Sequence, residues 1–262
     1  MGPSDLTVDA VDAAVETFTR LPAPPSRLER LSLFLDLDGV LAEFASTPDG
    51  VVPVSRRTEA LRAIRTRLNG RVAIVSGRTV AEIDRITDNV IASASGVHGL
   101  ERRRADGTFL RAEASKSLRA VIAAFEAFAR AHPGVVVEDK GVSAGLHFRG
   151  APDAAQDAES LARRLADEHG LMLQPGHMVL ELKTPGASKG TALTAFMQEA
   201  PFAGGVPVML GDDQTDEDGF RAATDLGGFG VLVGPPRATA ARYSLTGVTA
   251  VLDWLEQLES DV

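Results

Sequence analysis

The most constraining feature of this chain is the segment LSLFLDLDG at residues 31–39, an apolar run that ends in two aspartates. Apolar side chains on both faces of an extended segment are typical of a central strand in a parallel sheet covered by helices on both sides. Asp36 and Asp38 would lie at the carboxyl end of this strand, where open α/β sheets bind their ligands. The alternative is a surface turn aspartate beside one that caps the next helix. The apolar run favours a buried strand end.

Strand and helix patterns alternate on both sides of the chain's middle. A helix near 56–69, capped by Ser55, precedes a buried strand at 71–77, and Thr79 with Glu82 forms a capping box for another helix. From Ser188 the alternation resumes, with helices at 188–200, 216–224 and 249–259 and strands at 206–211 and 228–234. This alternation predicts an α/β fold with a doubly wound, Rossmann-like parallel sheet.

The pattern between these two blocks is different. It predicts a helix at 117–131, consecutive strands at 135–140 and 142–149, a helix at 153–169 with Asp153 as N-cap and Gly170 past its end, and a strand pair at 171–185 that turns at Pro175–Gly176. This αββαββ order predicts an inserted α+β domain with antiparallel strands.

The predicted organisation has four parts. Residues 1–26 comprise a weak amphipathic helix at 6–20 and the proline-rich linker LPAPPS, because three closely spaced prolines stop a helix. Residues 27–112 and 186–262 form the two parts of the core domain, and residues 113–185 form the inserted domain.

Composition limits the possible partners. Lys and Arg number 27 against 36 Asp and Glu, so the formal charge is −9, which disfavours nucleic acid as a partner. The chain has no cysteine, which excludes disulfides and thiol catalysis. It has no apolar run of about 20 residues, the length that a membrane span needs, and its first residues lack a basic signal-peptide region. We expect a cytoplasmic monomer that acts on a small molecule.

A second acidic cluster, GDDQTDED at 211–218, follows another apolar strand. Asp212, Asp213 and Asp216 would therefore lie at the same sheet edge as Asp36 and Asp38. Converging carboxylates repel unless a cation lies between them, and oxygen ligands favour Mg²⁺ or Ca²⁺ over Zn²⁺. Helix capping by Asp213 or Asp216 explains one of these residues but not the group.

Two further segments predict anion binding. Ser76 and Arg78 follow the strand at 71–77 and lie near a helix N-terminus, where a hydroxyl and a guanidinium suit an anion. Lys189 lies in the first turn of a helix, where a cation opposes the helix dipole. A lysine directed at a phosphate and a carboxylate explains this position better than an ordinary surface lysine. Together with the acids, these groups predict phosphoryl transfer through an aspartyl intermediate.

These segments also carry a resemblance. FLDLDGVL, SGR, the lysine of SKG and GDDQTDED occur in the order of the four motifs of the haloacid dehalogenase superfamily. GVHGLE, VEDKGVSAGLHFR, VLELK and GDDQTDEDGF resemble the trehalose-6-phosphate phosphatase family, over about residues 31–258. The chain departs from the family pattern at Val40, commonly a threonine, and at His177, usually a lysine.

The resemblance implies a Mg²⁺-dependent hydrolase that converts trehalose 6-phosphate into trehalose and phosphate, the last step of trehalose biosynthesis. It implies Asp36 as nucleophile and Asp38 as general acid and base, with Ser76 and Lys189 holding the transferring phosphoryl group. Mg²⁺ would be bound by Asp36, the main-chain carbonyl of Asp38, and Asp212, with Asp213 and Asp216 in the same acidic shell. The substrate contacts would come from Gly39, Arg78, Glu138, Asp139, Lys140 and Glu181.

Several alternatives stay open at this point. The chain could hydrolyse another sugar phosphate, such as sucrose phosphate or mannosylglycerate phosphate. A phosphomutase is disfavoured because the inserted domain offers acids and few spare cations to grip a second phosphate. A non-catalytic sensor is disfavoured because it would not need Asp36. For His147, on a predicted strand of the inserted domain, packing or a backbone contact is the expected role.

Overall fold

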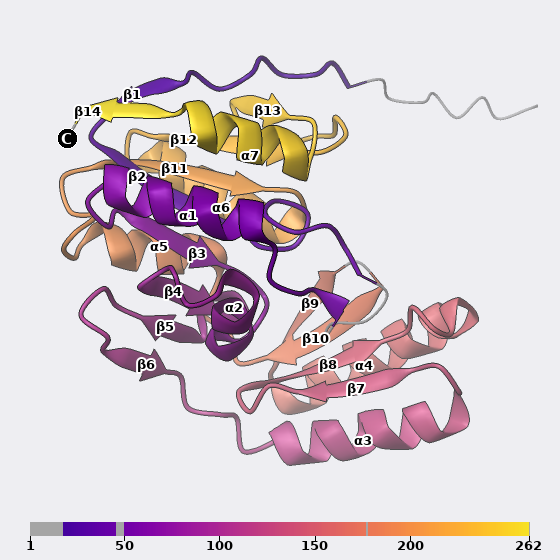
Figure 1. The fold of residues 1–262 in the computed structure, drawn as a ribbon. Helices are drawn as coiled ribbons and strands as arrows, with labels where there is room; N and C mark the ends of the chain where they lie inside the picture. The colour runs from indigo at the N-terminus through magenta and orange to yellow at the C-terminus, as the bar shows by residue number, and fades with distance from the viewer. Residues whose placement is uncertain (1–17, 46–49, 177, 262) are drawn as a thin grey trace, which may run out of the picture.

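The computed structural model describes residues 18–45, 50–176 and 178–261, which form two layered units joined side by side (Figure 1). The larger unit is built on an eight-stranded sheet and the smaller one on a four-stranded sheet. Among the described residues, no helix has the length and hydrophobicity needed to cross a bilayer.

The large sheet has the order β13-β12-β11-β2-β3-β4-β5-β6. Its first six strands in this order pair in parallel, and β5 and β6 extend the edge as an antiparallel hairpin. The strands are β2 (Leu31–Leu35), β3 (Val72–Val75), β4 (Ser93–Gly96), β5 (Glu101–Arg103), β6 (Phe109–Arg111), β11 (Val206–Gly211), β12 (Phe229–Val233) and β13 (Tyr243–Leu245). The predicted parallel core is confirmed.

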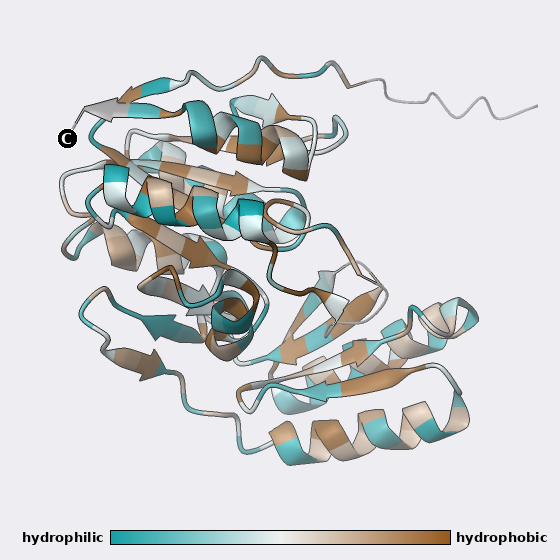
Figure 2. Ribbon diagram, viewed as in Figure 1, coloured by the Kyte–Doolittle hydropathy of each residue, from teal (hydrophilic) through white to brown (hydrophobic). Residues whose placement is uncertain are grey.

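Helices cover both faces of this sheet, and the sequence of β2 shows why. Its leucines at 31, 33 and 35 pack with α1 (Ser55–Arg67), α2 (Val80–Thr87) and α7 (Val248–Gln257), whereas Phe34 packs with α5 (Lys189–Met197) and α6 (Glu217–Asp225). Successive strand residues point to opposite faces, so one apolar run supplies two cores. In Figure 2 the central strands β2 and β3 are mainly brown, whereas α1, in front of them, mixes teal and brown.

The smaller unit, called the cap below, has the predicted αββαββ order. Its antiparallel sheet has the order β7-β8-β10-β9, and α3 (Leu118–Ala131) and α4 (Ala155–His169) pack on one face of it. The strands are β7 (Val136–Asp139), β8 (Ser143–His147), β9 (Met172–Gly176) and β10 (Val179–Lys183). The chain enters the cap after β6 and returns to the core between β10 and α5.

The proline-rich segment lies against the core, contrary to the expectation of a linker. The carbonyls of Pro22 and Pro25 accept hydrogen bonds from Ser244 N and Trp254 Nε1, at 2.9 and 3.1 Å. Next, β1 (Arg27–Glu29) pairs in parallel with β14 (Glu259–Asp261). The predicted helix at 6–20 falls mostly outside the described residues, and 18–20 are not helical.

Several predicted helix ends and turns need correction. Ser55 is the first residue of α1 and makes no cap hydrogen bond, because Val54 occupies the N-cap position. Arg57, in the first turn, donates to the carbonyls of Val52 and Ile86. Asp153 lies in a 3₁₀ turn at Pro152–Ala154, so it does not cap α4.

The capping box of Thr79 and Glu82 is confirmed, as is the left-handed Gly170 after α4. Pro175 and Gly176 belong to β9, so the turn to β10 comes later, where Met178 has a φ of 63°. The predicted turn position is therefore wrong by about two residues.

Candidate active site

A pocket of about 300 Å³ lies between the cap sheet and the carboxyl end of the core sheet. The core lines it with Asp36, Asp38, Ser76, Arg78, Lys189, Asp212 and Asp213, and the cap with Glu138, Lys140, His147 and Glu181. Of the predicted site residues, Gly39, Asp139 and Asp216 lie outside this lining. Segments distant in sequence thus meet at the carboxyl end of β2, where Asp36 and Asp38 had predicted a site.

Lys189 is the centre of a buried charge cluster in the core. Its Nζ lies 2.7 Å from Asp36 Oδ2 and 2.7 Å from Asp216 Oδ1. Burial alone would lower the pKa of Lys189, but Asp216 and Asp36 raise it, so the ammonium stays charged. Burial raises the pKa of Asp36 well above its usual value, against the opposing effect of Lys189. Lys189, in the first turn of α5, therefore has the carboxylate partners that its position at a helix N-terminus predicted.

Three carboxylates in this cluster could share a cation. Asp36, Asp212 and Asp216 each present an oxygen within 4.8 Å of the others. With one ammonium among them, full ionisation leaves two excess negative charges. Burial raises the pKa of Asp212 to about 7, and Asp216 and Asp213 add to the rise. A hard divalent cation fits this set of oxygen donors.

Two glycines allow the carboxylates to approach. Gly39 has a φ of 73°, and a Cβ there would collide with the Asp212 carboxylate. A Cβ at Gly211 would collide with the side chain of Asp216, whose Oδ2 accepts from Asp212 N at 3.0 Å. Gly39 therefore makes room for Asp212 from the neighbouring strand.

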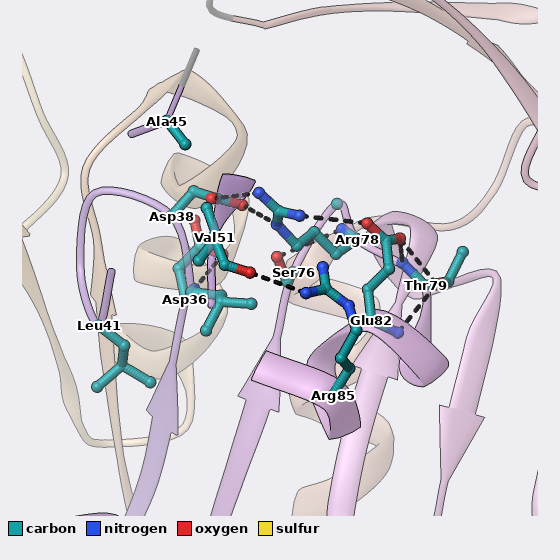
Figure 3. Close-up of polar contacts among 12 residues, drawn as sticks. Asp36, Asp38, Leu41, Ala45, Val51, Ser76, Arg78, Thr79, Glu82 and Arg85 are labelled. Carbon is teal, nitrogen blue, oxygen red and sulfur yellow. Dashed lines mark hydrogen bonds and ion pairs between the residues drawn. The ribbon is translucent and has the colours of Figure 1, made fainter. Parts of the chain in front are cut away.

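Asp38 is bound by Arg78 from the next strand end, as Figure 3 shows. Arg78 Nε and Nη2 donate to the two Asp38 oxygens at 2.7 and 2.9 Å, and Nη1 donates to Glu82 at 3.2 Å. Such a bidentate pair fixes both side chains. The fully buried Ser76 lies on the same loop, and its hydroxyl accepts from Arg78 N at 3.4 Å.

On the cap, strand alternation brings the predicted substrate residues to the pocket face. Glu138, Gly145 and Glu181 are register partners across β7, β8 and β10, while their neighbours Leu146 and Leu180 point into the cap core. Gly145 leaves a stretch of sheet without a side chain between the two glutamates. The Glu138 carboxylate and the His147 ring lie over Gly145, so this part of the pocket wall is polar.

Lys140 connects the cap to the core. Its Nζ donates to Glu181 Oε2 at 2.7 Å and to the carbonyl of Gly77 at 2.8 Å, and lies 3.7 Å from Glu138 Oε2. Burial alone would raise the pKa of Glu181, but Lys140 brings it down to about 2. Both charges of this pair are therefore present at neutral pH.

Two histidines complete the pocket wall. His147 Nε2 lies 2.8 Å from Glu138 Oε2, so the expectation of packing or a backbone contact is wrong. The neighbouring strand brings the two side chains to the same face. His98, which the residue patterns did not single out, lies with its Nε2 3.7 Å from Glu181, and burial lowers its pKa to about 3, so it is neutral. Only the GVHGLE motif pointed to its position.

Two predicted site aspartates have local partners. Asp213 accepts from the backbone and hydroxyl of Thr215, each at 2.6 Å, and so caps a 3₁₀ turn at Gln214–Asp216. Asp139 accepts from Gly141 N at 2.7 Å in the β7–β8 turn. Val40, the departure from the D-G-T pattern, is fully buried in the core cluster around β2. His177 lies outside the described residues.

Comparison with known proteins agrees with this geometry. The sequence model of the trehalose-phosphatase family matches residues 34–249. The chain belongs to this family. A trehalose-6-phosphate phosphatase of Escherichia coli K12 is 39% identical over 247 residues, which cover 91% of this chain and 90% of that protein.

Solved structures show the same fold. The C-terminal domain of a C. albicans trehalose-6-phosphate phosphatase has a TM-score of 0.78 at 22% identity, covering 90% of this chain and 96% of that one. A haloacid dehalogenase-like hydrolase from Bacteroides thetaiotaomicron has a TM-score of 0.64 at 17% identity, covering 88% and 99%. This member of the trehalose-phosphatase family therefore has the α/β core and cap of the haloacid dehalogenase superfamily, and it is a phosphoric monoester hydrolase.

Proposed function

We propose that this member of the trehalose-phosphatase family hydrolyses trehalose 6-phosphate to trehalose and phosphate. The observation that carries the proposal is one pocket with two chemically distinct walls. The core wall presents Asp36 and Lys189, which suit a phosphoryl group, and the cap wall presents Glu138, Lys140 and Glu181, which suit sugar hydroxyls. The substrate named for the E. coli relative has both parts.

Asp36 is the proposed nucleophile. One of its oxygens accepts from Leu37 N at 2.7 Å and the other from Lys189 Nζ, so the carboxylate is fixed in orientation. An Asp36 oxygen would form the bond to phosphorus while the bond from phosphorus to the sugar oxygen breaks. Lys189 and Ser76 would bind the oxygens of the transferring group.

Asp38 is the proposed proton carrier. As acid it would protonate the departing sugar oxygen, and as base it would take a proton from the water that cleaves the aspartyl phosphate. In the structure, Arg78 binds both oxygens of Asp38. We infer that the incoming phosphate draws Arg78 away, which releases the Asp38 carboxyl for proton transfer.

The proposed cofactor is Mg²⁺. Asp36 and Asp212 would bind it, with the carbonyl of Asp38 and with Asp216 and Asp213 beside them. Mg²⁺ would supply positive charge that offsets the crowded carboxylates and the phosphate.

The first test is phosphate release from a panel of sugar phosphates, with Mg²⁺ or with excess EDTA. The panel contains the 6-phosphates of trehalose, sucrose and glucose, and mannosylglycerate phosphate. We expect trehalose 6-phosphate to give the highest kcat/KM, and EDTA to reduce the rate at least tenfold until Mg²⁺ is restored. A higher kcat/KM for another sugar phosphate in the panel would refute the substrate assignment. Undiminished turnover in EDTA would refute the metal requirement.

The cap assignment is tested by Glu138→Ala, measured on trehalose 6-phosphate and on an aryl phosphate. A hydrogen bond to a charged group contributes roughly 1.5–3 kcal/mol, so we expect kcat/KM for trehalose 6-phosphate to fall about 10–100-fold. The aryl phosphate has no sugar for Glu138 to contact, so its hydrolysis should change little. Glu126→Ala, on the exposed face of the cap helix α3, is the matched control. Equal losses on both substrates would mean that Glu138 supports the fold and does not contact the sugar.

A further inference from the structure

A chain of contacts through Glu101 and Arg111, which has no role in the proposed mechanism, links the core to the turn that carries Lys140. Glu101 Oε2 accepts from the backbone N–H of Val80, at the start of α2, at 2.9 Å. The other oxygen of Glu101 lies 3.2 Å from Arg111 Nε. Arg111 Nη2 in turn donates to the main-chain carbonyl of Lys140 at 2.7 Å.

The β5–β6 hairpin explains how these groups meet. Glu101 and Arg111 are direct register partners across its two antiparallel strands. The Glu101 side chain is only 7% exposed, whereas that of Arg111 is 46% exposed. The buried carboxylate therefore lies against Nε of the guanidinium, while Nη2 reaches the cap. Arg111 is also the last residue of β6, just before the chain crosses into the cap.

The cap turn is shaped to receive this guanidinium. Gly141, next to Lys140, has a φ of 76°, and a Cβ there would collide with Arg111 Nη2. Its backbone N–H is bound by Asp139 at 2.7 Å, which fixes the turn in this conformation. The glycine therefore provides both the left-handed turn and the space for Arg111.

Lys140 is thus bound to the core at two points. Its Nζ binds the Gly77 carbonyl, and its main chain is bound by Arg111. A substrate sugar that bonds to Nζ would compete with the first contact but would leave the second intact. Arg111 is the contact that can persist when the pocket is filled.

We propose that Arg111 is a positioning residue for substrate recognition. Through the Lys140 carbonyl it fixes the sugar-contacting lysine relative to the core, and Glu101 connects this contact to the N-terminus of α2, beside the Ser76–Arg78 loop. The inference rests on the proposed function, because it requires Lys140 to contact the sugar. Arg111 itself touches neither the substrate nor the reacting atoms.

The test measures kcat and KM for trehalose 6-phosphate and for an aryl phosphate with Arg111→Ala, Arg111→Lys and the control Arg104→Ala. Arg104 lies near the same hairpin, is comparably exposed and is also ion-paired, but its partner is Glu199 and not the cap. Losing one charge-assisted hydrogen bond should lower kcat/KM for trehalose 6-phosphate about tenfold in Arg111→Ala, mainly through KM. The aryl phosphate should change less than about twofold. Arg111→Lys should recover little, because a point charge cannot bridge Glu101 and the carbonyl as the planar guanidinium does.

A double variant separates positioning from general stabilisation. If Arg111 acts through Lys140, Arg111→Ala combined with Lys140→Ala should be no worse than Lys140→Ala alone. Multiplied losses, equal losses on both substrates, or wild-type kinetics in Arg111→Ala or Arg111→Lys would overturn the inference. The wild type is measured first. If the wild type does not hydrolyse trehalose 6-phosphate, the proposed function fails as well. If the wild type is active and the Arg111 variants have the same kinetics, the positioning role alone is refuted.

Discussion

Asp36→Asn is expected to reduce turnover of trehalose 6-phosphate by at least about 10³-fold, because an amide oxygen is a poor nucleophile toward phosphorus. The fold should survive. Asn has the same shape, and its carbonyl can still accept a hydrogen bond from Leu37 N or Lys189 Nζ. The raised pKa of Asp36, due mainly to burial, means that the fold disfavours the ionised carboxylate, so the neutral amide should be at least as stable.

The measurement pairs steady-state kinetics with a thermal melt. Asp225→Asn is the matched control, since it makes the same chemical change at an exposed position of the core, at the end of α6 and outside the pocket lining. We expect wild-type turnover in the control and an unchanged or higher Tm in Asp36→Asn. More than a few per cent of activity in Asp36→Asn would show that another group attacks phosphorus.

Asp38→Asn should be nearly as damaging, because it removes two proton transfers that are each worth about 10²–10⁴-fold. The two steps can be separated with an aryl phosphate whose leaving group departs without a proton. The first step should then proceed, whereas the aspartyl phosphate should persist because no base activates water. The expected signature is a burst of about one aryl alcohol per enzyme, followed by slow turnover.

The burst must depend on Asp36 if the assignment is correct. The double variant Asp36→Asn with Asp38→Asn should show neither burst nor turnover. Steady turnover at the wild-type rate in Asp38→Asn would exclude this residue as the proton carrier. A burst that survives in the double variant would place the covalent intermediate on another side chain.

The sequence could predict the site on the core because its acidic residues and the Ser76–Arg78 segment follow recognisable strands, and Lys189 opens a predicted helix. Apolar runs before Asp36 and Asp212 identify buried strands, and parallel strands bring their carboxyl ends to one edge. The αββαββ order predicted the cap sheet. Glu138 and Glu181 were expected from the family resemblance, and the observed register places them on the same face of that sheet.

Other features could not be predicted because their causes are tertiary. Strand β4 has the sequence SASG, which lacks the β-branched and aromatic residues that mark a strand, yet all four residues are buried beside β3. The next hairpin, β5–β6, is short and rich in arginine, so it has no apolar pattern of its own. Consequently the Glu101–Arg111 pair and its contact with the cap appear only in the folded chain.

Local capping rules also have limited power for acidic clusters. In GDDQTDED, Asp213 and Asp216 form a capping box together, so both bind their own turn, and only Asp216 also accepts from Lys189 through its other oxygen. Spacing alone cannot distinguish them, since both precede a helix. The difference comes from α5, which places Lys189 next to one carboxylate and not the other.

The bidentate contact between Arg78 and Asp38 has a consequence for inhibition. A ligand enters a pocket in which Arg78 and Asp38 are already paired. A ligand that binds Arg78 must replace Asp38, so its net binding free energy is the energy of the new contact minus that of the ion pair. An anionic ligand can offer Arg78 a replacement for Asp38, whereas neutral trehalose cannot. Non-hydrolysable analogues of trehalose 6-phosphate should therefore inhibit far better than free trehalose. After each cycle, re-formation of the Arg78–Asp38 ion pair would help to displace the phosphate product.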